Sequence, residues 1–282
     1  MNAEIEAQWR NEFQTAPIER VHAWLEREPG LVSAPVDCTL KSGSVRRWSP
    51  LFVASNHLRD LDKVKALVEA GADLTNGKWG THWPSEDYAI NAYFIERGID
   101  VNQPSYLGFH AIGVTGLDSF FLMLEHGLDP NSAWPHNGES LLHVQARHDD
   151  DAHLARAHAL IRAGANVSVQ ALSGLDEEPI MDNEHFVQFG RETPLHFAAR
   201  LGNMRQVRLL LAHGADPTMR TVSNMVEPKQ FVDWPTDVTA LMWPKKTFQR
   251  LLFEPYDGET PLDMAVREGH DQIADALRSH RP

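Results

Sequence analysis

The sequence is poor in the features on which several classes of protein depend. It has one cysteine, Cys38, which excludes an internal disulfide and a zinc site built from thiolates. No stretch approaches the roughly 18 consecutive apolar residues of a membrane-spanning helix. The opening residues, MNAEIEAQWRNEFQ, are charged and lack the apolar core of a secretory signal. We therefore expect a cytoplasmic protein that does not bind membranes.

Positive charge is also scarce. The chain has 26 Lys and Arg against 39 Asp and Glu, which gives a formal net charge of -13. Such a surface repels the phosphate backbone of nucleic acids but attracts a basic protein. We expect no nucleic-acid partner, and a protein partner with a basic surface is compatible with this charge.

Familiar catalytic motifs are missing too. The sequence has no G-x-S-x-G elbow, no P-loop, no H-E-x-x-H and no glycine-rich dinucleotide turn. Cys38 lies near Lys41, Arg46 and Arg47, whose charges would lower the pKa of its thiol. No accompanying base is identifiable, so we interpret Cys38 as a loop residue and expect neither an enzyme nor a bound cofactor.

Histidines are numerous, and four of them fall in HVQARHDDDAHLARAH, at His143, His148, His153 and His158. Intervals of five residues separate successive side chains by about 140° on a helix, so they would not share one face. The spacing therefore predicts no metal site here.

The chain does contain internal repetition. The stretch TPLHFAARLGNMRQVRLLLAHGADPTMR, residues 193–220, places Thr193 as a helix N-cap and Pro194 at the first helical position. Gly202 and Gly214 follow where the two helices would end. This stretch resembles the ankyrin repeat almost position for position.

The pattern recurs with decreasing fidelity. It begins again at Thr260, Ser140 and Ser49, and two further copies are visible mainly by their endings at Gly98 and Gly127. The resemblance implies an all-α solenoid of antiparallel helix pairs: one domain over 1–282, with a helical cap at 1–30 and six repeats within 48–280. We expect the free protein to be a monomer.

Two junctions between repeats are too long. About a dozen residues would separate a helix-ending glycine from the next Thr-Pro in a period of about 33. Gly164 to Thr193 takes 29 steps and Gly214 to Thr260 takes 46. The excess predicts finger-like insertions at about 171–191 and 221–258, next to the concave face of the solenoid.

The two insertions differ in chemistry. The first carries Asp176, Glu177 and Glu178, which would either steer a cationic partner or simply be solvated. The second is rich in large apolar residues, and the segment KKTFQRLLFE has helical spacing. We expect a helix there that folds back on the repeats, with most of the apolar residues in a small core and the rest available to a partner.

Tryptophan precedes proline four times in the chain. These residues and Trp79, which falls near a hairpin tip, are candidate binding anchors because a rigid indole loses little entropy on binding. The alternative is that the rings fill gaps between irregular repeats. The four are Trp83, Trp134, Trp234 and Trp243.

The family resemblance implies a noncatalytic module that binds another protein through its concave face and fingers. An acidic binder with long fingers would suit an inhibitor or immunity protein for a basic toxin or enzyme, and an effector or adaptor would look similar. The alternative class is an enzyme or effector whose site is assembled from the insertions on an ankyrin scaffold.

Overall fold

A computed structural model describes residues 2–39, 43–74, 83–102, 116–133, 138–171, 189–232 and 248–280. For the three strands at 189–190, 222–232 and 248–257 it describes the backbone alone. The chain divides into two compact units, Met1–Asp129 and Pro130–Pro282. Within the described residues, no helix has both the length and the apolar character needed to cross a bilayer.

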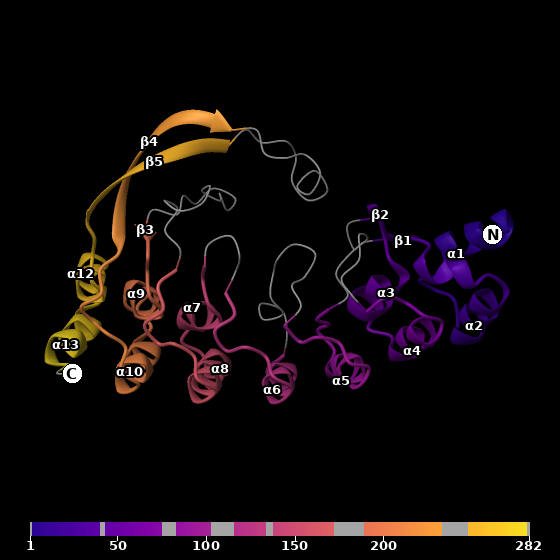
Figure 1. Ribbon diagram of the computed structural model, residues 1–282, viewed down its shortest axis with the longest axis horizontal. Helices are drawn as coiled ribbons and strands as arrows, with labels where there is room; N and C mark the ends of the chain where they lie inside the picture. Colours follow the sequence, from indigo (N-terminus) through magenta and orange to yellow (C-terminus); the bar gives the residue numbers. More distant parts are fainter. Residues whose placement is uncertain are drawn as a thin grey trace. The chain divides into compact units, whose positions relative to one another are not determined.

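The first unit is mainly helical (Figure 1). A helical pair occupies the segment expected at 1–30, while its role as a cap and the count of six repeats stay predictions. The elements are α1 (Ala3–Glu12), α2 (Ile18–Arg27), η1 (Pro29–Ser33), β1 (Val36–Thr39), β2 (Val45–Trp48), α3 (Pro50–Phe52), the π-helical η2 (Val53–Leu58), α4 (Leu61–Glu69), α5 (Tyr88–Glu96) and α6 (Leu117–Glu125).

Aromatic rings form the core at the start of this unit. The ring of Trp9 lies 4.8 Å from Phe13 and 5.8 Å from Trp24, centroid to centroid. All three side chains are buried, and the indole N–H of Trp9 donates to the carbonyl of Ala34 at 3.1 Å. This bond satisfies the one polar group of the buried ring.

Cys38 corrects one expectation. It lies in strand β1, paired with Arg46 of β2, rather than in a loop, and its side chain is buried. Burial raises the pKa of its thiol, which is opposite to the effect that neighbouring cations would have. The reason is the alternation along β1, which buries Val36 and Cys38 and leaves Asp37 and Thr39 less buried.

The described residues of the second unit form three helix pairs. The first helices of the pairs, α7, α9 and α12, pack side by side, and the second helices, α8, α10 and α13, form a second row (Figure 1). The elements are α7 (Leu141–Ala146), α8 (Asp151–Arg162), β3 (Phe189–Gly190), α9 (Pro194–Arg200), α10 (Met204–Ala212), β4 (Val222–Val232), β5 (Phe248–Asp257), α12 (Pro261–Arg267) and α13 (Asp271–Ser279).

The predicted N-caps explain where the first helices begin. Thr193 accepts a hydrogen bond from the backbone N–H of His196, and Thr260 accepts one from that of Asp263. Proline follows each threonine at the first helical position, where its missing N–H costs nothing. Ala198 and Ala199 are completely buried, which allows neighbouring helices to approach closely.

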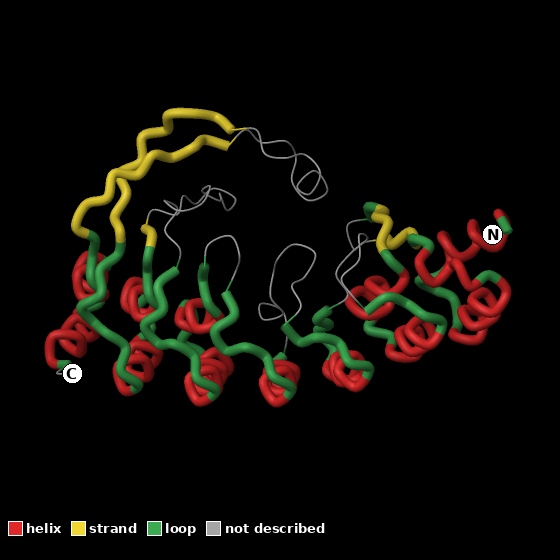
Figure 2. Tube along the Cα trace, viewed as in Figure 1, coloured by secondary structure: helices red, strands yellow, loops and turns green. Residues whose placement is uncertain are grey.

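The second insertion corrects the predicted secondary structure. The segment expected to be helical is strand β5, which pairs antiparallel with β4 from Val222↔Asp257 to Val232↔Phe248 (Figure 2). β3 adds two residues at the edge of β4, so the second unit contains a small sheet as well, separate from the β1–β2 sheet of the first unit. The backbone of β5 is extended because it pairs with β4, and the spacing of apolar residues within one segment does not indicate such a pairing. Whether the apolar side chains form a core lies outside the described side chains.

Candidate partner-binding surface

Buried histidines hold the first helices of the second unit in register. The backbone N–H of Thr193 donates to Nδ1 of His196 at 3.1 Å, so the ring proton belongs on Nε2. That Nε2 then donates to the carbonyl of Glu259 at 3.1 Å. His143 makes the equivalent bond to the carbonyl of Glu192 at 3.0 Å. Each histidine therefore connects its own helix to the repeat that follows.

These two histidines are uncharged at neutral pH. Burial lowers the pKa of His143 and of His196 to about 4, from an ordinary value of 6.5. The hydrogen bonds to backbone carbonyls oppose this effect but are weaker than it. Helices α7 and α9 are therefore each linked to the following repeat by an uncharged histidine whose two ring nitrogens are hydrogen-bonded.

A repeated ion pair connects the beginning and the end of each of these helices. In each of the three, a glutamate directly before the N-cap meets an arginine of the last helical turn or just after it. We call these six residues the Glu–Arg row. Its pairs are Glu139 with Arg147 at 2.6 Å, Glu192 with Arg200 at 3.3 Å, and Glu259 with Arg267 at 2.9 Å.

The row is continuous between α7 and α9. The guanidinium carbons of Arg147 and Arg200 lie 4.9 Å and 5.2 Å from the ring centroid of Phe197, a buried residue. Cation–π contacts of this kind restrain both arginines over one aromatic ring. The side chain of Glu192 is nearly buried, and burial raises its pKa while the Arg200 guanidinium lowers it. Arg147 and Arg267 remain about 41% exposed and accessible to a partner.

Both insertions leave the repeats beside this row. The backbone N–H of Ala171 donates to the carbonyl of Glu192 at 2.9 Å, and that of Thr221 donates to the carbonyl of Glu259 at 3.0 Å. Ala171 and Thr221, where the insertions predicted at about 171–191 and 221–258 begin, are therefore each hydrogen-bonded to the residue before the next N-cap, and we call these two points the finger roots. At the second root, a Cβ on Gly258 would lie 1.4 Å from the carbonyl oxygen of Thr221, so only glycine fits.

Among the predicted binding residues, Trp83 is described by the structure. Its side chain is 1% exposed, and its ring lies 6.4 Å from that of Phe94 in an edge-on contact. Trp83 is therefore a core residue of the first unit, in keeping with the alternative that the tryptophans fill gaps. The others lie outside the described residues: Trp79, Trp134, Asp176, Glu177, Glu178, Trp234 and Trp243.

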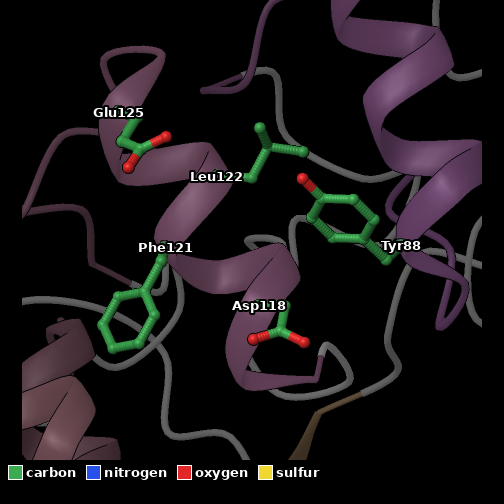
Figure 3. A pocket seen from close by; sticks show the side chains of 5 residues that line it. All are labelled: Tyr88, Asp118, Phe121, Leu122 and Glu125. Carbon is green, nitrogen blue, oxygen red and sulfur yellow. The ribbon is translucent and has the colours of Figure 1, made fainter.

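The first unit has a surface pocket between α5 and α6 (Figure 3). Its walls are apolar and acidic, and its two carboxylates stand at opposite ends of α6. This arrangement does not bring an acid and a base to one point, so it supplies no catalytic pair. The lining residues are Tyr88, Asp118, Phe121, Leu122 and Glu125.

The histidine cluster also differs from expectation. His148 lies in the turn before α8 and His153 lies inside it, so the helical angle used for the prediction does not apply to this pair. Their rings stack with centroids 4.1 Å apart, and Asp150 lies beside them. The inference that their spacing keeps them apart is wrong.

Sequence reasoning missed the Glu–Arg row because it concentrated on the insertions. The signal was nevertheless present: ESLLHVQAR, ETPLHFAAR and ETPLDMAVR each place arginine eight residues after a glutamate that precedes the N-cap. A residue pair that recurs in register with the repeat, but is not needed for the helix caps, indicates a shared surface.

Comparison with known families agrees with the geometry. The ankyrin-repeat family model matches residues 191–222 and 257–281, which contain α9 with α10 and α12 with α13. No curated protein matches the chain. Ankyrin repeats therefore occupy these two parts of the second unit.

Proposed function

We propose that this chain, whose ankyrin repeats indicate a protein–protein interaction module, binds a partner protein across the Glu–Arg row and the adjoining fingers. The observation that carries the proposal is the row itself. Three ion pairs stand at equivalent positions on neighbouring helices, and two arginines of the row are substantially exposed. Arg147 bonds Glu139 through Nη2 alone, so its exposed guanidinium can offer further N–H donors to a partner, whereas Arg267 is bound to both Glu259 and Glu268.

Rigidity supports the same reading. The caps and buried histidines fix the helices, and the cation–π contacts restrain Arg147 and Arg200. A surface whose side chains are already ordered loses less entropy when a partner binds. The finger roots at Glu192 and Glu259 share residues with the row, so both regions would reach the same partner.

We further propose that the partner is a protein with a basic surface, and that this chain acts as its inhibitor or immunity protein. The net charge of -13 supports a cationic partner through long-range attraction. The acidic residues Asp176, Glu177 and Glu178 would add to that attraction, and Trp234 and Trp243 would supply anchors. In this proposal the free protein is a cytoplasmic monomer that binds neither nucleic acid nor membranes and has no catalytic role.

Capture from native lysate with matched charge swaps tests the proposed surface. The test variant exchanges Glu139→Arg with Arg147→Glu, which keeps an ion pair on α7 but reverses what a partner meets. The control exchanges Asp275→Arg with Arg278→Asp, a pair on α13 in the second row of helices, 2.9 Å apart in the parent.

The parent and the control should enrich the same protein, while the α7 swap should lose it. Melting curves of all three would verify that the fold is retained. If the α7 swap captures the same protein as fully as the parent does, binding through the Glu–Arg row is contradicted.

A further inference from the structure

We propose that His148, Asp150 and His153 form a binding site for a divalent transition-metal ion of the Zn²⁺ type. One ligand atom from each residue lies within 4.8 Å of the other two. Two imidazoles and one carboxylate are a ligand set that suits zinc, whereas Mg²⁺ and Ca²⁺ prefer oxygen ligands alone. The proposal does not depend on the proposed partner.

Binding an ion needs a modest rearrangement of the side chains. Nδ1 of His153 and a carboxylate oxygen of Asp150, 2.6 Å apart, would exchange their hydrogen bond for the ion, and the two stacked imidazole rings would turn a nitrogen toward it. Ligand atoms on one tetrahedral zinc lie about 3.4 Å apart, given bonds of about 2.1 Å. The widest separation therefore shortens by roughly 1.4 Å at most. His148 and Asp150 are exposed, so their side chains can rotate into place.

Residues 203–206 of the next repeat form hydrogen bonds with the turn that carries His148. Asn203 donates to the carbonyl of Ala146 at 2.8 Å, and Gln206 donates to the carbonyl of His148 at 2.9 Å. Arg205 donates from its backbone and its guanidinium to Asp149. These bonds fix the backbone that carries His148, so only side chains need to move when an ion binds.

Local charge is compatible with a cation. Asp150 supplies a negative ligand and caps α8, which offsets the positive end of that helix. Arg147 is already engaged with Glu139 and Arg205 with Asp151, while Arg156 interacts electrostatically with Asp150 and would compete with a cation there. Three protein ligands leave at least one position on the ion open to water or to a group from another molecule.

Titration of the whole chain with Zn²⁺, and with Co²⁺ as a visible-absorbing substitute, tests the site. The variants are His148→Ala, His153→Ala and Asp150→Asn, and the matched control is His158→Ala, farther along α8. We expect each of the three to lower the Zn²⁺ affinity at least tenfold and the control to leave it within twofold. Because Asn caps a helix as well as Asp does, Asp150→Asn separates lost coordination from a lost cap.

Imidazole NMR signals show which rings hold the ion. Shifts of His148 and His153 on addition of Zn²⁺, at one ion per chain, would support the proposal. It is overturned if the parent gives neither binding heat nor Co²⁺ absorption bands. It is equally overturned if His148→Ala and His153→Ala bind Zn²⁺ as the parent does, because the ion then lies elsewhere.

Discussion

At the residue scale, the two buried histidines make stability depend on pH. His143 and His196 have pKa values of about 4 when folded and an ordinary value of 6.5. Between these values the unfolded chain takes up more protons than the folded one. Their contribution to stability is therefore complete above pH 6.5 and is lost as the pH falls toward 4. The loss is on the order of 3 kcal/mol for each histidine.

Urea unfolding of the chain at several pH values between 4 and 7 measures this slope. His196→Ala should be less stable at pH 7 but lose less on acidification. Glu192 acts in the opposite sense: burial raises its pKa, so its contribution is present below the usual value of 4.5 and is lost as the pH rises through the folded value. Glu192→Gln should consequently steepen the slope. A slope shared by His196→Ala and the parent would contradict the assignment.

At the scale of helices and strands, close helix packing is the most sensitive feature. Ala199 is completely buried in α9, so Ala199→Leu forces extra volume into the junction of neighbouring helices. We expect a loss of about 1–3 kcal/mol in the free energy of unfolding. Ala89→Leu is the matched control, since Ala89 is exposed on α5. Equal unfolding midpoints for the two variants would contradict the prediction, because they would show that the space around Ala199 can hold a leucine side chain.

The same scale separates what sequence could predict from what it could not. The caps at Ser140, Thr193 and Thr260 were predictable because capping chemistry is local. Strand β5 was not, because the spacing of Phe248 and its apolar neighbours also fits a helix, and the decisive partner β4 lies across the insertion. Trp83 was equally ambiguous, because a Trp-Pro dipeptide does not indicate whether the ring is buried.

At the scale of the whole molecule, the proposed basic partner should associate at a rate that depends on the net charge of the chain. Because the chain has a formal net charge of -13, its association with a basic protein should slow as added salt screens the attraction. Changing Asp176, Glu177 and Glu178 to Lys should slow it further at low salt and have less effect at high salt. Stopped-flow mixing with the captured partner provides the measurement. If neither added salt nor the three substitutions changes the association rate, electrostatic steering of the partner is contradicted.

The candidate site was predictable only in part at this scale. The ankyrin resemblance rested on the residues of 193–220, and the boundaries of the insertions stay predictions, whereas the Glu–Arg row requires knowing that Arg147 and Arg200 meet over Phe197. The single domain over 1–282 stays a prediction, since the chain divides into two compact units.

The forward hydrogen bonds of the histidines also make them reporters. His143 senses the backbone at Glu192, in the second helix pair of this unit, and His196 senses Glu259, in the third. If the third pair opens locally, His196 should lose its acceptor and titrate like a solvated imidazole while His143 does not. Two ring signals in an NMR spectrum would thus reveal the order in which neighbouring repeats come apart, with no label added to the protein.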